Sequence, residues 1–301
     1  MTAMHDSTAQ GRFMLLRVTI GVAVLAVWLA PQALWGQERF KEPVYRVAKK
    51  NRPQTPGQKA HPLDPAIKIA EEALARFRRD VRDYQAILVK RERINGVLGD
   101  TEFAFVKIRN ERTLEAKRTQ PFSVYMYFLK PSKVQGREVL YVKGHNGGKM
   151  LAHEGPNNVI LGRFGSVWLA PDGRIAMRGQ RYPVTEIGIE NLIVKLLEKG
   201  YRDRKRGECE VEFRKGTKIN DRTCTMLQVT HPVPRPYFDF HVAQIFIDDE
   251  LQVPVRYAAY LWPEKKGGRP VLLEEYTYLK LKLNPGYTDK DFDSKNPKYN
   301  F

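Results

Sequence analysis

The sequence predicts an α+β fold in which one antiparallel, strongly curved sheet carries helices on one face. Three observations support this prediction: an early helical period, a long succession of strand-like segments, and a second helical period inserted among them. Because strands do not alternate with helices, a parallel doubly wound sheet is disfavoured. With 301 residues, 42% of them hydrophobic and 28% charged, the chain has the composition of a folded protein with a sizeable core.

Two segments show the period of an amphipathic helix. The first starts near Asp64, with Pro65 at the favoured first helical position, and a second is predicted at 186–201. The first carries one apolar stripe at steps of three and four, made by Ile67, Ala70, Leu74, Phe77 and Val81. Because its other face is charged, we expect this helix to cover a sheet.

Strand-like segments precede and follow the second helix. The earlier ones are 84–94, 101–109, 121–129, 138–143 and 149–153, with shorter candidates at 159–161 and 174–178. The later ones are a hairpin at 208–230 and strands at 241–247, 253–262 and 270–283. The remaining tail is irregular.

The N-terminus has the layout of a secretory signal. Arg12 and Arg17 precede an apolar run at 18–30, which is shorter than the roughly 20 residues that span a bilayer. We therefore predict a signal peptide, or an N-terminal anchor if it is retained, at 1–36. A flexible basic linker is predicted at 37–62 and one domain at 63–301. The protein is expected to be exported and periplasmic or associated with the cell envelope.

The net charge of +17 favours anionic partners, including anionic lipid headgroups. No RNP-type motif or zinc finger is present, and an exported protein does not meet nucleic acid, so nucleic acid is not expected as a partner.

Catalytic and metal-binding patterns are missing from the sequence. The histidines show no HExxH spacing, and no GxSxG or Cys/His nucleophile arrangement occurs. Glu274 and Glu275 are adjacent in a predicted strand, so they point to opposite faces and cannot form an acid–base pair. We expect no enzyme activity, no metal site and no cofactor.

The chain holds two cysteines, Cys209 and Cys224, in the predicted hairpin. Pairing its strands about a turn at 215–218 places the two cysteines opposite each other, which predicts a cross-strand disulfide in an oxidising compartment. The alternative is a pair of half-buried thiols.

Several predicted strands are apolar on both faces. A strand with one wet face alternates polar and apolar residues, so both faces here need cover, and one of them can hold a ligand. The cavity candidates are aromatic side chains: Phe103, Phe105, Tyr125, Tyr127, Tyr257, Trp262, Tyr276 and Tyr278. The alternative is that these residues form an ordinary core under the helices.

Two stretches resemble the LolA-like superfamily of outer-membrane lipoprotein-sorting proteins. The segment 121–153, PFSVYMYFLKPSKVQGREVLYVKGHNGGKMLAH, is similar to its run of strand, Pro, strand, glycine turn and strand. The segment 274–292, EEYTYLKLKLNPGYTDKDF, resembles its closing strand. Over roughly residues 64–301 the chain resembles an exported planctomycete family of this superfamily, domain of unknown function 1571.

The resemblance implies a half-barrel whose concave face is covered by helices, with an apolar cavity between them. It also implies a periplasmic carrier or binder of a lipid or an acylated, lipoprotein-like ligand. An alternative from a different functional class is an envelope interaction or structural module that binds a protein or an anionic polymer through its basic surface. The sequence leaves the ligand and the oligomeric state open.

Overall fold

The computed structural model describes residues 40–48, 61–113, 119–157 and 165–301, which belong to one compact unit, Arg39–Phe301. The predicted export signal at 1–36, most of the predicted linker and the candidate strand at 159–161 lie outside the described residues. Within the described part of the chain, no helix is long and apolar enough to cross a membrane.

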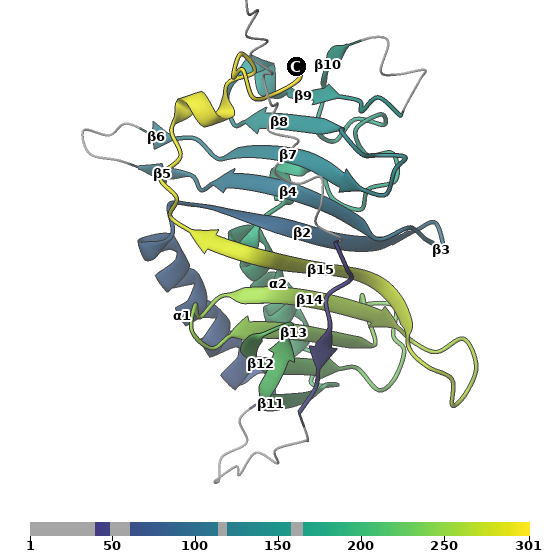
Figure 1. Cartoon of the computed structure of the whole chain (residues 1–301). Coiled ribbons are helices and arrows are strands. Elements are labelled where there is room, and N and C mark those ends of the chain that lie inside the picture. The colour runs from purple at the N-terminus through teal and green to yellow at the C-terminus, as the bar shows by residue number, and fades with distance from the viewer. Residues whose placement is uncertain (1–39, 49–60, 114–118, 158–164) are drawn as a thin grey trace, which may run out of the picture. The chain divides into compact units, whose positions relative to one another are not determined.

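One large antiparallel, curved sheet forms the body of the protein, as predicted (Figure 1). Its strands run in the order β1-β11-β12-β13-β14-β15-β2-β4-β7-β8-β9-β10, with β3 paired to β2. They are β1 (Tyr45–Arg46), β2 (Asp83–Ile94), β3 (Val97–Leu98), β4 (Glu102–Arg109), β7 (Ser123–Lys130), β8 (Glu138–Val142), β9 (Met150–His153), β10 (Ser166–Leu169), β11 (Glu210–Ile219), β12 (Arg222–Thr230), β13 (Val242–Asp248), β14 (Pro254–Leu261) and β15 (Val271–Leu283). A separate small hairpin pairs β5 (Arg112–Thr113) with β6 (Thr119–Gln120).

Two helices, α1 (Asp64–Asp80) and α2 (Ile189–Arg204), lie on the same, concave face of the sheet, which we call the helix face (Figure 1). Helix α2 starts three residues later than the sequence predicts, because Gly188 before it has φ of 116°. A Cβ on Gly188 would come within 2.8 Å of the Tyr84 hydroxyl, which accepts a hydrogen bond from the Ile189 backbone N–H. Glycine is therefore required where α2 joins the sheet.

The opposite face, which we call the outer face, is covered by the two ends of the described chain. In the C-terminal segment 284–301, Tyr299 stacks on Tyr125 of β7 with 3.8 Å between ring centroids. In the segment 40–48, the Tyr45 ring lies 4.2 Å from the Arg256 guanidinium of β14. Because these two segments cover the outer face and the helices cover the other, several strands are apolar on both faces.

Two short segments differ from the sequence expectation. Residues 174–178 form turns, and the last strand of that edge is β10 instead. At the other edge, residues 40–48 belong to the predicted linker, yet β1 pairs with β11, which had a free edge to accept it.

The predicted disulfide is wrong, since Cys209 and Cys224 are both free thiols. The hairpin turns at Asn220, later than assumed, so Cys224 pairs with Thr217 while Cys209 precedes the pair Glu210–Thr230. Cys209 lies eight residues along the chain from Thr217, the partner of Cys224. This separation is about 25 Å at the rise of a strand, and a disulfide requires Cα atoms within about 7 Å.

Both thiols are expected to react slowly in the folded protein. Burial, with a smaller effect of nearby aspartates, raises the pKa of Cys209 to about 11 and that of Cys224 to about 12, so the reactive thiolate is scarce at neutral pH. Thiol labelling at pH 7 should be slow until denaturant is added and should then modify both cysteines. A mass gain of two hydrogens on treatment with a reductant would contradict this assignment.

Candidate amphipathic ligand site

An apolar hollow of about 80 Å³ lies between the two helices and strands β12 to β14. Helix α1 presents the small side chains of Ala66, Ala70 and Ala73 to it, so the helix does not fill the space. The other apolar lining comes from Leu63, Ile67, Ile69, Ile193, Leu196, Leu197, Leu227, Val229, Phe240, Ala243, Ile245, Ile247 and Pro254. Lys199 and Asp203 of α2 are its charged lining residues.

A second hollow, of about 400 Å³ and more polar, shares Lys199 and Phe240 with the first. It lies between the residues that precede α2, the loop that precedes β13, and strands β14 and β15. Its lining residues are Arg181, Tyr182, Lys199, Asp239, Phe240, Tyr257, Ala259, Leu261, Leu273 and Glu274. Because the two hollows share lining residues, they lie next to each other, and we treat them together as a candidate amphipathic site.

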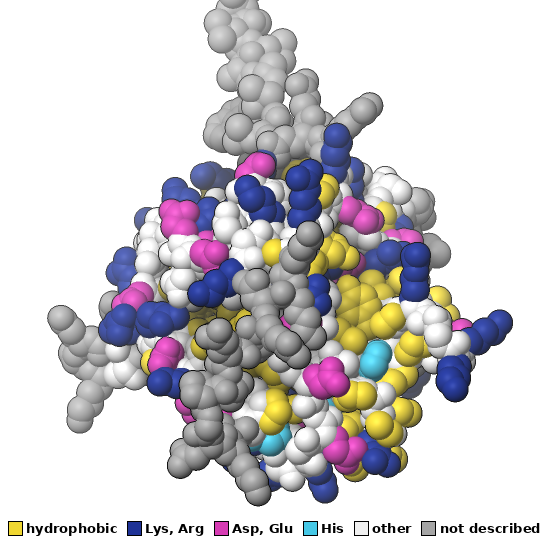
Figure 2. Space-filling view, turned by 90° about the horizontal axis from the view of Figure 1, so that it is seen from below, with side chains coloured by type: hydrophobic (Ala, Val, Ile, Leu, Met, Phe, Trp, Pro, Cys, Tyr) yellow, Lys and Arg dark blue, Asp and Glu magenta, His cyan; other side chains and the backbone are white. Residues whose placement is uncertain are grey.

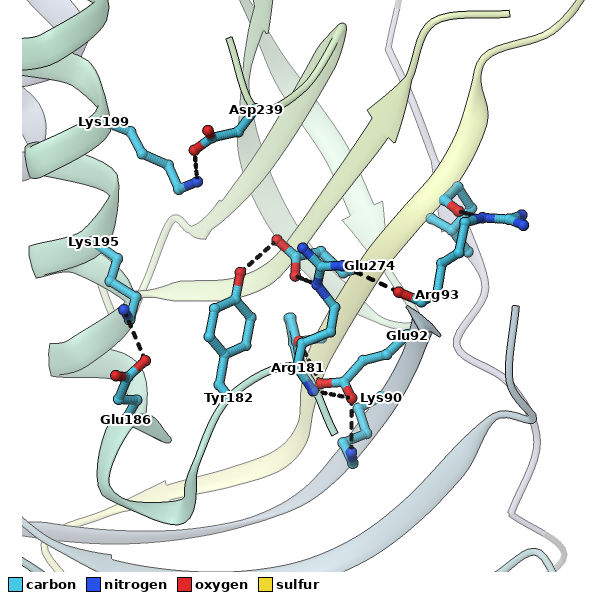
Figure 3. Close-up of polar contacts among 12 residues, drawn as sticks. Lys90, Glu92, Arg93, Arg181, Tyr182, Glu186, Lys195, Lys199, Asp239 and Glu274 are labelled. Atoms are coloured by element: carbon cyan, nitrogen blue, oxygen red, sulfur yellow. Dashed lines mark hydrogen bonds and ion pairs between the residues drawn. The ribbon is translucent and has the colours of Figure 1, made fainter. Parts of the chain in front are cut away.

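The polar hollow is built around Glu274, a carboxylate that is only 2% exposed (Figure 3). Arg181 donates to it from Nε at 2.8 Å, and the Tyr182 hydroxyl donates at 3.1 Å. Burial, with a further contribution from the Glu274 charge, raises the pKa of both Tyr182 and Tyr257. These phenols therefore remain protonated donors at neutral pH.

A second buried carboxylate, Glu92 of β2, lies beside Glu274 in the sheet register. It accepts hydrogen bonds from the Tyr276 hydroxyl at 2.6 Å and from the Arg181 backbone N–H at 3.2 Å, and Lys90 Nζ lies 3.3 Å from it. Arg181 therefore ties the segment before α2 to both β2 and β15, and this network fixes the wall of the polar hollow.

Lys199 and Asp239 form an ion pair where the two hollows meet (Figure 3). Although burial alone would raise the pKa of Asp239, hydrogen bonds from Lys199 and Arg202 hold it below its usual range, so the carboxylate is ionised. Lys199 lines both hollows, whereas Asp239 lines only the polar one. An anionic ligand group can replace the Asp239 carboxylate as the partner of Lys199.

The loop that carries Asp239 is anchored by a fully buried histidine, His231. Its ring stacks on Phe238 with 3.8 Å between centroids, and its Nδ1 lies 3.0 Å from the Phe240 carbonyl oxygen. Burial lowers the pKa of His231, so the ring is neutral at neutral pH. The histidine thus has a positioning role for the loop that supplies Asp239 and Phe240 to the site.

Four of the eight predicted cavity residues lie on the outer face. Phe105, Tyr125 and Tyr127 belong to the cluster under the C-terminal segment. Phe103 packs against Phe40 with ring centroids 6.0 Å apart. Their period-two pattern is that of a buried strand face, but the face they share is the one without helices.

The other four predicted residues are divided between the helix face and the rim of the sheet. Tyr257, Tyr276 and Tyr278 lie on the helix face, and Tyr257 lines the polar hollow. Trp262 lies next to the end of β14, where its Nε1 donates to the His231 carbonyl oxygen at 3.1 Å. The predicted set is therefore not brought together in one site.

Sequence reasoning missed Lys199 and Asp203, the two charged residues of the apolar hollow. A signal for them existed, since both continue the stripe of Leu192 and Leu196 at steps of three and four along the predicted second helix. A charged residue on an apolar stripe marks a site where a buried polar contact is made. Arg181 carried no such signal, because it lies in an irregular segment.

Within the described residues, no group of three or more His, Cys, Asp or Glu side chains could hold a metal ion. The site instead offers an apolar space, aromatic rings, hydroxyl donors and paired charges, which is the chemistry of binding an amphipathic molecule.

The curved antiparallel sheet with two helices over its concave face places the protein in the α+β class. The chain itself belongs to the family "protein of unknown function (DUF1571)", whose match spans residues 81–301. The predicted family is thereby confirmed, while the planctomycete origin stays a prediction. No curated protein matches the chain.

Solved structures with a similar fold include a LolA superfamily protein from Nitrosomonas europaea. It has 11% sequence identity and a TM-score of 0.29, with 75% of this chain and 96% of that chain covered. A DUF1329 family protein from Desulfovibrio piger has 10% identity and a TM-score of 0.37, with coverages of 78% and 98%.

The Pseudomonas aeruginosa MucA/MucB complex is also similar, with 15% identity and a TM-score of 0.40. The match covers 76% of this chain and only 61% of that one. All three of these TM-scores are below 0.5.

Proposed function

We propose that this protein is an exported carrier or binder of a lipid or acylated ligand in the bacterial cell envelope. The observation that supports the proposal is the meeting of an apolar and a polar hollow at Lys199 and Phe240. An acyl chain suits the aliphatic hollow, and a polar head suits the hollow with Arg181, Lys199 and the tyrosines. A non-enzymatic role fits a site that offers binding groups and an ion pair.

The apolar hollow is too small for a complete acyl chain as it stands. Its volume of about 80 Å³ is below the roughly 150 Å³ of an engineered protein cavity that holds one benzene. Its walls come from two layers, the helices on one side and β12 to β14 on the other. Loading therefore requires the helices to move away from the sheet, which enlarges the hollow without breaking a strand pair.

Native mass spectrometry tests the proposal. Protein from Gln37 onward, purified from a host with a bacterial envelope, is expected to retain an acylated species that dissociates on activation. The protein should also take up phospholipid when the empty form is offered vesicles. Protein that stays empty in both experiments would overturn the carrier function and favour an interaction module that binds a protein or an anionic polymer through its basic surface.

A further inference from the structure

Three loops at one end of the sheet surround the polar hollow. Residues 231–241 connect β12 to β13 and supply Asp239, while residues 262–270 connect β14 to β15 between the lining residues Leu261 and Leu273. In an antiparallel meander, these alternate connections leave the same end of the sheet. The third loop, 170–183, supplies Arg181 and Tyr182. We call these three segments the mouth loops.

The mouth loops carry a surplus of exposed basic side chains. Those at 170–183 and 262–270 are Arg174, Arg178, Lys265, Lys266 and Arg269, and none of them makes an ion pair within the described residues. The acidic side chains of the same two loops are Asp172 and Glu264. Figure 2 shows basic side chains projecting on the side where Figure 1 places the β14–β15 turn, with hydrophobic side chains next to them.

Exposed aliphatic side chains accompany this charge. Ile175 is 71% exposed, between Arg174 and Arg178, and Val233 is 47% exposed, close to Arg235. A bilayer interface accepts small apolar side chains into its boundary region while its anionic headgroups attract the neighbouring cations. A folded anionic protein offers the charge but no such boundary, so a lipid surface fits this combination better.

We propose that the mouth loops dock the protein on an anionic lipid bilayer, with the polar hollow facing the membrane. Docking in this orientation places the hollow directly against lipid headgroups, so a ligand passes between membrane and protein without crossing open water. The inference rests on the proposed function for the identity of the cargo, but the docking itself is measured without reference to any bound ligand.

Vesicle co-sedimentation of the full chain tests the proposal. We expect binding to vesicles of phosphatidylcholine with phosphatidylglycerol, weaker binding to phosphatidylcholine alone, and loss of the difference at high salt because exposed charges are screened. The triple variant Lys265→Glu, Lys266→Glu, Arg269→Glu should bind the anionic vesicles at least about tenfold more weakly, since each basic residue near such a surface adds substantially to binding. These three positions are exposed in the loop between β14 and β15, so the fold should persist.

A matched variant separates docking from general charge attraction. Lys149→Glu, Lys290→Glu, Lys295→Glu changes the net charge by the same amount at exposed positions outside the mouth loops. It should bind anionic vesicles as the wild type does, and both variants share any contribution of residues 1–39. Equal weakening of the two variants, an unchanged mouth-loop variant, or a wild type without preference for anionic vesicles would each overturn the docking surface. None of these readouts depends on whether lipid is found in the hollow.

Discussion

Ala70→Phe is expected to reduce the amount of bound acyl ligand at least about tenfold while the thermal midpoint stays close to that of the wild type. Ala70 lies on α1 and lines the apolar hollow. Its side chain is only half-buried, so a phenyl ring at this position can occupy part of the hollow and remain partly at its solvent-facing edge. Each methylene kept out of the hollow costs the ligand about 0.8 kcal/mol, so two lost methylenes account for about a tenfold change.

Ala75→Phe is the matched control for this prediction. Ala75 lies on the same helix, is exposed, and does not line either hollow. Quantitative lipid extraction from the two variants and the wild type, together with thermal unfolding, separates ligand exclusion from loss of stability. If Ala70→Phe retains as much lipid as Ala75→Phe, the ligand lies elsewhere and the hollow is a packing defect.

The second large effect concerns stability, and we expect Asp248→Ala to lower the free energy of unfolding by about 3 kcal/mol. Asp248 ends β13 and is fully buried. Its Oδ1 accepts hydrogen bonds from Arg222 Nη2 at 2.8 Å and from the backbone N–H groups of Glu250 at 3.0 Å and Leu251 at 2.8 Å. Alanine removes the acceptor of the two backbone N–H groups and the buried partner of Arg222, which keeps only its exposed contact with Glu250. Each N–H group left without a partner costs about 1–3 kcal/mol.

Glu250→Ala is the control, because Glu250 pairs with the same arginine from the surface. Its Oε2 lies 3.0 Å from Arg222 Nη2, but its side chain is 82% exposed. An exposed pair contributes at most about 1 kcal/mol. Urea unfolding of both variants provides the comparison, and equal losses would show that burial of Asp248 does not matter.

The contribution of Asp248 should also depend on pH. Burial alone would raise the pKa of its carboxyl, but hydrogen bonds from Arg222 and from the backbone N–H groups outweigh burial and lower it. A carboxyl with a depressed folded pKa stabilises the fold fully above its unfolded pKa of about 4, and this stability is lost as the pH falls through the folded value. Asp248→Asn should therefore lose less stability than the wild type on acidification below about pH 4.

The type and order of most elements could be predicted from the sequence. Both helices, the strands around them and the large antiparallel sheet follow from apolar spacings of three to four and of two. The ends of elements were less predictable when a single contact determined them. Helix α2 starts at Ile189 because Gly188 takes a positive φ under the Tyr84 hydroxyl, and Tyr84 is more than 100 residues away in the chain.

The candidate site could be predicted only in part. Strands that are apolar on both faces indicated that both sides of the sheet are covered. They did not indicate which face lies under the helices. Tyr125 and Tyr257 have the same chemistry and the same kind of strand, yet one packs under the C-terminal segment and the other lines the polar hollow. The register of the β11–β12 hairpin could not be predicted from the sequence either. Cys209 and Cys224 face each other only if the turn is placed four residues too early.

The sequence by itself determined the export-like N-terminus, the basic charge, the strand and helix periods and the family, because these depend on residue type and local spacing. Only the tertiary structure decided that Lys199 and Asp239 meet between two hollows, and that the chain's own ends cover the outer face. Such contacts join residues far apart in sequence. Their geometry depends on sheet register and on which face each helix covers, and local spacing carries no information about either.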